Sequence, residues 1–394
     1  MIQIVYGDIS KSTGFSQRIR RQKKYVFDEI GLEYITINIP NKMNSESLKE
    51  YKAEIDKQYQ NVIVFSNINE GKFKKAFKIF KLISKIRRER LTNILYCESF
   101  MASFLGSLYK LINPKVKLII DIHGVAPEER FYYSKMSSVS FKFLKFIEFA
   151  YIKLAYHVIC VSPKLKAHYE SNYFKDSSRI SVVPNCIFGN EKDVKPEMST
   201  QEELTLNRKA KSWSEEDIVI TYAGGIGVYH CLNEIVEFYI NARKNNNNLK
   251  LQLLIPQNYD LQDVISFSDR EKHSIKVLQV PHNKVSEYLK ISDYLIILRE
   301  NLLLNIVADP TKVPEYLSVG VPLIYTSSVS TVAENKFNIS FNFDDRELVS
   351  KQQRFERVSY QNRTNLFKHN NDYLVKNYSW SNYIETYKEV FNES

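Results

Sequence analysis

Short apolar segments alternate with helical segments along the whole sequence, and this alternation limits the fold more than any other feature. Apolar runs of this length, separated by helices, are typical of buried strands in β-α units. We expect strands at residues 1–6, 34–39, 61–65, 93–97, 116–121, 157–161, 179–184, 218–223, 249–255, 275–279, 294–298 and 321–325. The sequence therefore predicts an α/β fold of Rossmann-like domains.

The length of the chain predicts two domains. A chain of 394 residues is too long for one compact core. After the strand at 179–184 comes a polar stretch, 189–216, which we interpret as a linker with a helical insert. We place the boundary near Asn185 to Ile187, which gives one Rossmann-like domain at 1–187 and another at 188–377. The last segment, 378–394, is an amphipathic helix.

The positive charge of the chain is concentrated in the first half. Residues 1–190 contain 31 Lys and Arg against 17 Asp and Glu, whereas residues 191–394 contain 24 against 28. An excess confined to one half indicates an anionic partner for that half. Nucleic acid and an anionic membrane surface are both candidates.

Several classes of protein are disfavoured by the sequence. The four cysteines have neither CxxC nor CxxH spacing, which argues against a zinc site or a disulfide framework. No run of 18 uncharged apolar residues is present, and the first residues lack the features of a signal peptide. We therefore expect a cytoplasmic protein without a membrane span.

The stretch from Asp309 to Tyr325, DPTKVPEYLSVGVPLIY, predicts a short helix followed by a buried strand. Asp309 or Thr311 can cap this helix. The backbone N–H groups of Thr311, Lys312 and Val313 would then be free, and a helix start of this kind attracts phosphate. Glu315 lies one turn further along and suits ribose hydroxyls better than phosphate. This order of groups favours a nucleotide.

This segment resembles the donor-site signature of glycosyltransferase family 4, in the form PTKxxEYLxxGxPxI of bacterial polysaccharide enzymes. The resemblance implies the GT-B fold, with two Rossmann-like domains facing a central cleft and the C-terminal helix crossing back to the first domain. It also implies that Glu315 binds ribose and that the helix start holds a diphosphate. The donor would be a nucleotide diphosphate sugar, with UDP expected as the nucleotide, and neither a metal nor a further cofactor is expected.

Two positions in the second domain depart from the family pattern. In the family, the loop after the strand at 218–223 supplies Lys or Arg to the diphosphate, but here Gly224 and Gly225 are followed by Val228, His230 and Cys231. Lys312 and Arg299 must then neutralise most of the phosphate charge. Val307 also stands where many relatives have the first of two Glu residues, so we expect Asn305 or Asp309 to replace it.

A second candidate site follows the strand at 116–121, in the segment DIHGVAPEER. Ligands of such sheets bind beyond the carboxyl ends of the strands, which places His123 at a reactive position. The segment is similar to the bacterial subgroup of family 4, in which this His meets the transferred sugar. Glu128 could act on the attacking hydroxyl, and Glu129 could bind the acceptor, but a helix-capping pair is an equal alternative. Gly14 matches the family's acceptor-side loop, or merely eases a turn.

Two segments of the first domain combine basic and aromatic residues. Residues 71–91 have nine basic side chains and one acidic side chain, with an apolar face formed by Phe73, Phe77, Phe80, Leu82 and Ile83. Residues 131–156 interleave lysines, including Lys135, with many aromatics. Each segment is either a packed helix with a solvated basic face or a surface that binds anionic lipid.

The resemblance implies a retaining glycosyltransferase that moves a sugar to a lipid-linked or oligosaccharide acceptor in cell-surface polysaccharide synthesis. We expect it at the cytoplasmic face of the inner membrane, in peripheral contact with anionic lipid. The main alternative is a non-catalytic GT-B partner protein, which the two departures from the family pattern would explain. A role in nucleic-acid binding is disfavoured because the sequence contains no recognised binding module.

Overall fold

The structure is a computed structural model of the 394-residue chain. It describes all residues except 11–12, 42, 66–70, 91, 135, 174–175, 191–197, 257–273, 336–339, 343–354 and 393–394. The chain forms two compact units. Unit 1 comprises Met1–Asn190, Val307–Asp309 and Trp380–Ser394, and unit 2 comprises Glu191–Ile306 and Pro310–Ser379.

Unit 1 is built on a seven-stranded parallel sheet in the order β3-β2-β1-β4-β5-β6-β7. The order reverses between β1 and β4, which is where ligands bind in doubly wound sheets. The strands are β1 (Ile2–Tyr6), β2 (Ile35–Ile39), β3 (Val62–Val64), β4 (Ile94–Glu98), β5 (Lys117–Ile122), β6 (His157–Cys160) and β7 (Ile180–Val182).

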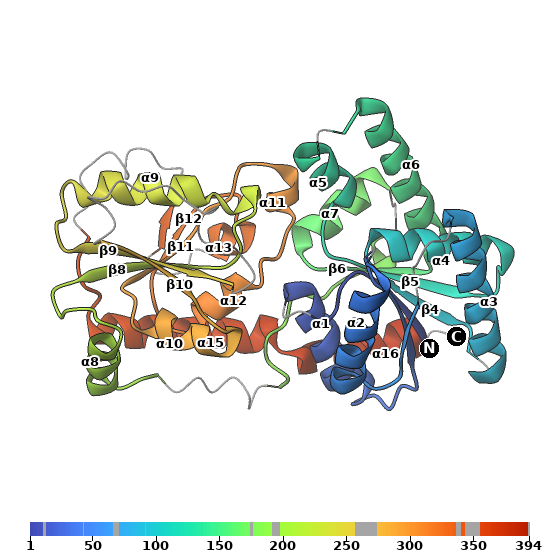
Figure 1. Cartoon of the computed structure of the whole chain (residues 1–394), viewed down its shortest axis with the longest axis horizontal. Helices are drawn as coiled ribbons and strands as arrows, with labels where there is room; N and C mark the ends of the chain where they lie inside the picture. The colour runs from blue at the N-terminus through green and yellow to red at the C-terminus, as the bar shows by residue number, and fades with distance from the viewer. Residues whose placement is uncertain are drawn as a thin grey trace. The chain divides into compact units, whose positions relative to one another are not determined.

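Helices cover both faces of this sheet. They are α1 (Gly14–Gln22) with its π-helical extension (Lys23–Phe27), α2 (Ser45–Gln58), α3 (Lys72–Arg90), α4 (Phe100–Ile112), α5 (Ala126–Tyr133), α6 (Ser138–Leu154), α7 (Pro163–Asn172) and a short 3-10 helix (Ser177–Arg179). Helices α1, α2 and the C-terminal α16 (Ile384–Asn392) lie on one face in Figure 1. Buried side chains of α16, Tyr387 and Phe391, pack there against Phe27 and Tyr96.

Unit 2 contains a second parallel sheet, in the order β10-β9-β8-β11-β12-β13. Its strands are β8 (Ile218–Ala223), β9 (Leu249–Ile255), β10 (Ile275–Gln279), β11 (Tyr294–Ile297), β12 (Leu323–Tyr325) and β13 (Ser340–Asn342). Its helices are α8 (Gln201–Ala210), a 3-10 helix (Val228–His230), α9 (Leu232–Arg243), α10 (His282–Lys290), α11 (Leu303–Ile306), α12 (Lys312–Leu317), α13 (Ser330–Asn335) and α15 (Tyr360–Tyr378). Helices α9 and α10 lie on opposite faces of this sheet (Figure 1).

Residues 307–309 belong to unit 1 although the chain on both sides of them belongs to unit 2. Ser162 Oγ donates to the Val307 carbonyl at 2.6 Å, and the Asn185 backbone N–H donates to Asp309 Oδ2 at 2.6 Å. Asn185 Nδ2 also donates to the Asp309 carbonyl. The expected domain boundaries, at 187 and 377, did not account for residues 307–309, which belong to unit 1.

The buried face of α3 differs from the expected one. Ile79, Ile83 and Ile86 are buried, whereas Phe73 and Phe77 are 94% and 59% exposed. The expected C-terminal helix, 378–394, is also interrupted, because a 3-10 helix at Trp380–Tyr383 precedes α16. Among the described residues, no helix has the length and apolar character needed to span a bilayer.

Candidate functional site

The clearest feature of unit 2 is a close approach between Gly224 and Lys312 at the carboxyl end of β8. Gly224 has a φ of +149°, and a Cβ placed on it would lie 2.0 Å from Lys312 Nζ. Any larger residue would therefore displace the ammonium group. Lys312 Nζ donates to the Tyr222 hydroxyl at 2.8 Å, while that hydroxyl donates to the Gly225 carbonyl. The loop at Gly224 and Gly225 thus holds the Lys312 side chain in place.

Arg299 and Lys312 converge on His230. Arg299 Nη1 donates to His230 Nδ1 at 2.6 Å, and Lys312 Nζ lies 3.3 Å from the same atom. Burial is the main cause that holds the pKa of His230 far below its ordinary value, and the nearby Lys312 and Arg299 add to it. The imidazole is therefore neutral, and its Nδ1 atom accepts the hydrogen bond from Arg299. Among the described residues, neither cation forms an ion pair with a carboxylate. Arg299 therefore remains available to an anion, and an anion bound there would favour the charged form of the neighbouring Lys312.

The start of α12 contributes less to this anion site than the sequence suggested. The helix has six residues, and Thr311 at its N-cap makes no side-chain cap bond. The Val313 N–H donates to the Pro310 carbonyl at 3.0 Å, so the expectation of a free amide there is wrong. The tight turn at Pro310 uses this N–H within the first turn of the helix. Binding of phosphate would therefore depend mainly on the side chains of Lys312 and Arg299.

Glu315 lies one turn into α12 and remains accessible, with its side chain 26% exposed. Its Oε1 atom lies 3.3 Å from His282 Nε2, at the first position of α10. Position and exposure are consistent with the expected contact to ribose hydroxyls. His282 was not among the sequence-based candidates, because only tertiary structure brings α10 next to α12.

The two residues expected to replace the missing Glu are both engaged within the protein. Asn305 is buried, and its Nδ2 donates to the Glu300 carbonyl at 3.0 Å. Asp309 is buried against Asn185 in unit 1. Val307 itself is buried. This geometry does not support a role for Asn305 or Asp309 in place of the missing Glu.

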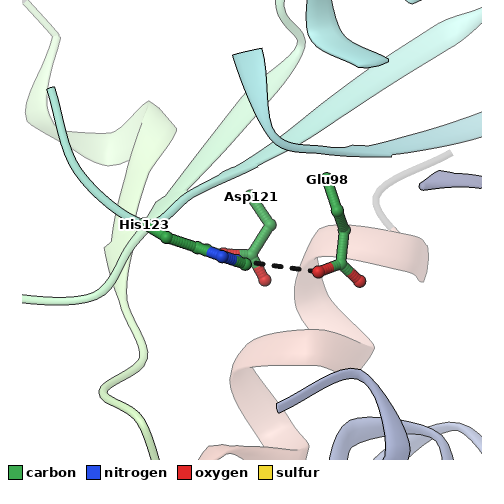
Figure 2. Close-up of side chains that lie close together, drawn as sticks. All are labelled: Glu98, Asp121 and His123. Carbon is green, nitrogen blue, oxygen red and sulfur yellow. Dashed lines mark ion pairs between the residues drawn. The ribbon is translucent and has the colours of Figure 1, made fainter. Parts of the chain in front are cut away.

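A second group of functional side chains lies in unit 1, at the carboxyl ends of β4 and β5. Asp121 and Glu98 are paired in register on these neighbouring strands, and His123 follows β5 directly. His123 Nε2 lies 3.2 Å from Asp121 Oδ1 and 3.6 Å from Glu98 Oε2. Figure 2 shows the ring edge of His123 directed at the two carboxyl groups. His123 therefore lies at the carboxyl edge of the sheet, as expected.

The two carboxyl groups differ in their surroundings. Asp121 accepts two bonds from Arg18, at 3.1 and 3.2 Å, and one from the Tyr96 hydroxyl at 2.6 Å. Burial opposes the charge of Asp121, but Arg18 and then His123 lower its pKa below the ordinary value. Glu98 is completely buried, and burial followed by Asp121 raises its pKa to about 8. Asp121 is thus ionised and Glu98 protonated at neutral pH.

Glu98, Asp121 and His123 are close enough together to hold a metal ion. The Arg18 guanidinium bonds both Asp121 oxygens, however, and would repel a cation bound there. We therefore do not assign these residues as metal ligands.

The remaining candidates of unit 1 are placed as follows. Glu128 Oε1 accepts from Lys145 Nζ at 2.7 Å, and Lys145 also bonds the buried Glu148. This ion pair ties Glu128 to α6 and provides a structural role for it. Glu129 is exposed in the first turn of α5. Gly14 begins α1, and the ring of the next residue, Phe15, lies 5.4 Å from the His123 ring.

Sequence similarity supports a family for part of the chain. Residues 45–187 match the family described as Glycosyltransferase Family 4. This match covers most of unit 1 after β2 and includes His123, Glu128 and Glu129. The sequence has no significant match among the curated proteins.

Solved structures with the same fold extend over the whole chain. A glycosyltransferase from Rickettsia africae has a TM-score of 0.67 at 15% identity, covering 100% of this chain and 98% of its own. WaaG, a glycosyltransferase involved in lipopolysaccharide biosynthesis, has a TM-score of 0.63 at 11% identity, with complete coverage of both chains. A trehalose-6-phosphate protein from E. coli, bound with UDP-2-fluoro glucose, has a TM-score of 0.62 at 12% identity, covering 100% and 99%. The predicted fold class, GT-B, is thus confirmed.

Proposed function

Because the chain carries a glycosyltransferase family 4 domain within a glycosyltransferase fold, we propose that it transfers a sugar from a nucleotide diphosphate sugar to a lipid-linked or oligosaccharide acceptor. The transfer retains the configuration of the anomeric carbon, as the donor-site signature implies. Cell-surface polysaccharide synthesis is the proposed pathway. The structural neighbour WaaG, which acts in lipopolysaccharide biosynthesis, supports this choice.

The observation that carries this proposal is the pair of cations at the donor end of unit 2. Arg299 and Lys312 meet at His230, and within the described part of the chain neither forms an ion pair with a carboxylate. A diphosphate would supply the missing negative charge, and Gly224 leaves the room that the Lys312 ammonium group occupies. Charge that develops on the departing diphosphate would then be stabilised by fixed cations rather than by a metal. Glu315 would bind the ribose.

We propose UDP as the nucleotide of the donor. The E. coli neighbour that binds UDP-2-fluoro glucose supports this choice. No further cofactor is proposed.

The acceptor end of the proposed reaction lies in unit 1. His123 would contact the transferred sugar, since it stands beyond the carboxyl end of β5 with its ring partly exposed. Glu129 and the Gly14 region would face the acceptor. Glu128, held by Lys145, would contribute to the charge around this acceptor region rather than act on the attacking hydroxyl.

We further propose that unit 1 contacts an anionic membrane surface on its cytoplasmic side. Val139, Phe143 and Phe146 of α6 are each at least 62% exposed, and Phe73 of α3 is almost fully exposed. Lysines alternate with these apolar groups on both helices. Apolar side chains that enter the lipid interface, together with cations that face the headgroups, bind such a surface cooperatively. A lipid-linked acceptor would be delivered there.

The test of the proposed reaction is release of nucleoside diphosphate from a panel of UDP-, GDP- and ADP-sugars, with and without a lipid extract as acceptor. Acceptor-dependent release from one donor, with a product of retained configuration by NMR, supports the proposal. Binding of a nucleotide without any transfer would favour the non-catalytic partner protein, to which the absence of a Glu at Val307 also points.

A further inference from the structure

A cavity in unit 2 is lined by basic side chains that the proposed reaction does not use. It lies between α8, the end of α10 and the start of α15, three helices on one side of the sheet (Figure 1). Its volume is about 180 Å³. Because one water takes roughly 30 Å³ of the liquid, the cavity has room for a polyatomic ligand. Four of its lining residues are cationic, namely Arg208, Lys290, Arg357 and Arg363, and none of the described lining residues is acidic.

The three arginines of this cavity meet on one buried carboxylate, Asp293. Arg208 Nη1 lies 3.0 Å from Asp293 Oδ2, and Arg363 Nη2 lies 3.1 Å from Oδ1. Arg357 Nε is 3.9 Å from the same Oδ1 atom. Within the described part of the chain, Asp293 is the only carboxylate that pairs with these arginines, and Lys290 pairs with none. One negative charge cannot neutralise four cations, so the cavity has a positive excess.

A structural role accounts for only part of this arrangement. Arg208 donates to the Ile291 carbonyl at 2.7 Å, and Arg363 donates to the Lys290 carbonyl at 3.0 Å, so both arginines tie helices to the segment after α10. Carbonyl groups carry no net charge, however, and the Arg208 Nε atom is buried without a hydrogen-bond partner. Burial lowers the pKa of Arg363, Asp293 opposes this effect, and Arg208 lowers the pKa further. The cations are thus crowded beyond what Asp293 offsets.

The start of α15 adds to the positive character of the cavity. Ser359 is the N-cap of this 19-residue helix, and its hydroxyl accepts from the Asn362 N–H at 3.2 Å. Ser359 and Tyr360 both line the cavity, so the positive end of the helix dipole lies beside the arginines. Arg357 and Tyr360 are exposed, which opens the cavity to solvent. A small anion can therefore enter it.

We propose that this cavity binds the phosphate group of a small anion, which is either inorganic phosphate or a phosphorylated metabolite. A phosphate brings more negative charge and more acceptor oxygens than a carboxylate, and so matches the excess better. Its oxygens would accept from Arg357 and Lys290, the less buried of the four cations. Asp293 directly precedes β11, whereas Arg299 follows it, so this cavity and the proposed donor site lie at opposite edges of the sheet. The inference does not depend on the proposed transfer.

The test is calorimetric titration of the full chain with inorganic phosphate, in which chloride keeps the ionic strength constant. Lys312→Met serves as the background, because it removes a cation of the proposed donor site and should still bind phosphate. Adding Arg357→Gln or Lys290→Gln should weaken this binding about tenfold or more, since each removes a charged donor. Lys209→Met is the matched control, because this exposed lysine of α8 does not line the cavity. Titration with glycerol phosphate then shows whether a phosphorylated metabolite binds more tightly than inorganic phosphate.

Absence of phosphate binding by folded Lys312→Met, or equal affinity with and without the two cavity substitutions, would overturn the inference. If Arg357→Gln does not fold, Lys290→Gln decides alone. Hydrogen exchange of the wild type provides the second measurement, because phosphate should slow exchange in the first turn of α15. Slowing confined to α12 would contradict the proposal. Arg357→Gln should bind nucleoside diphosphate as the wild type does, so a failure of the proposed donor site is seen separately.

Discussion

Arg299 Nη1 lies 2.6 Å from His230 Nδ1, and this hydrogen bond aligns a buried cation without neutralising it. A carboxylate partner would cancel the charge of Arg299, whereas a neutral imidazole accepts its hydrogen and leaves the charge intact. The 3-10 helix at Val228–His230 brings the histidine to this position. His230 therefore positions Arg299. It lies in the loop where glycosyltransferase family 4, which the sequence resembles, has Lys or Arg.

The first prediction concerns this histidine. His230→Ala should weaken binding of the nucleoside diphosphate about tenfold, or by ~1.4 kcal/mol, since Arg299 loses an acceptor. His230→Gln should retain most of the affinity, because its amide oxygen can accept from Arg299. Calorimetric titration measures both. Equal losses in the two variants would show that the shape of the imidazole, and not its acceptor atom, is important.

Nucleotide binding should also take up protons. In the free protein, the pKa of Lys312 lies well below its ordinary value, mainly because the side chain is buried and also because Arg299 is close by. A bound diphosphate favours the charged ammonium and raises that pKa, so affinity should fall as the pH rises through the range between the free and the bound pKa. Calorimetry in buffers with different ionisation enthalpies measures the protons taken up. In Lys312→Met, any residual binding should show no such uptake.

Glu98 should make the stability of unit 1 dependent on pH. Its folded-state pKa, about 8, lies above the ordinary value of 4.5. Between these values the unfolded chain loses the proton that the folded chain keeps, so this group destabilises the fold progressively as the pH rises. Hydrogen exchange of β4 and β5 amides should therefore show Glu98→Gln gaining stability relative to the wild type from about pH 5 to about pH 8. A pH-independent difference would contradict this assignment.

Binding to anionic vesicles should depend on the exposed face of α6. The double variant Phe143→Ser and Phe146→Ser should bind at least about tenfold more weakly, because two apolar side chains no longer enter the lipid. Leu206→Ser is a matched control, since Leu206 is 67% exposed on α8 of unit 2. Vesicle sedimentation compares the three proteins. Equal losses in the control and the double variant would exclude a specific surface.

Much of the fold could be predicted from local sequence, and the exceptions have local causes. The parallel strands are continuous apolar runs, which is why their positions could be predicted. β13 (Ser340–Asn342) was not expected, because this short segment contains polar residues. The exposure of Phe73 and Phe77 could not be read from helical spacing either. Of the expected face, Ile83 does pack inward, and its buried neighbours are Ile79 and Ile86.

The candidate sites were predicted where a motif coincides with a strand end, as for His123, or with a helix start, as for Lys312 and Glu315, and their roles remain predictions. Contacts between distant segments could not be predicted. Glu98 ends an apolar strand, and only the register with β5 places it beside Asp121. His282 meets Glu315 through the packing of two helices. The N–H of Val313 was assigned to a ligand because its bond to Pro310 depends on the exact turn.

The measurement that tests the central claim most directly is calorimetric titration of the full chain with UDP, GDP and ADP. The donor site predicts micromolar binding of one nucleotide, with UDP expected. Lys312→Met and Glu315→Gln should each lose this binding, whereas Lys209→Met, a change at an exposed lysine of α8, should not. Binding of none of the three nucleotides by the wild-type protein would contradict the account of unit 2 as a nucleotide-sugar site.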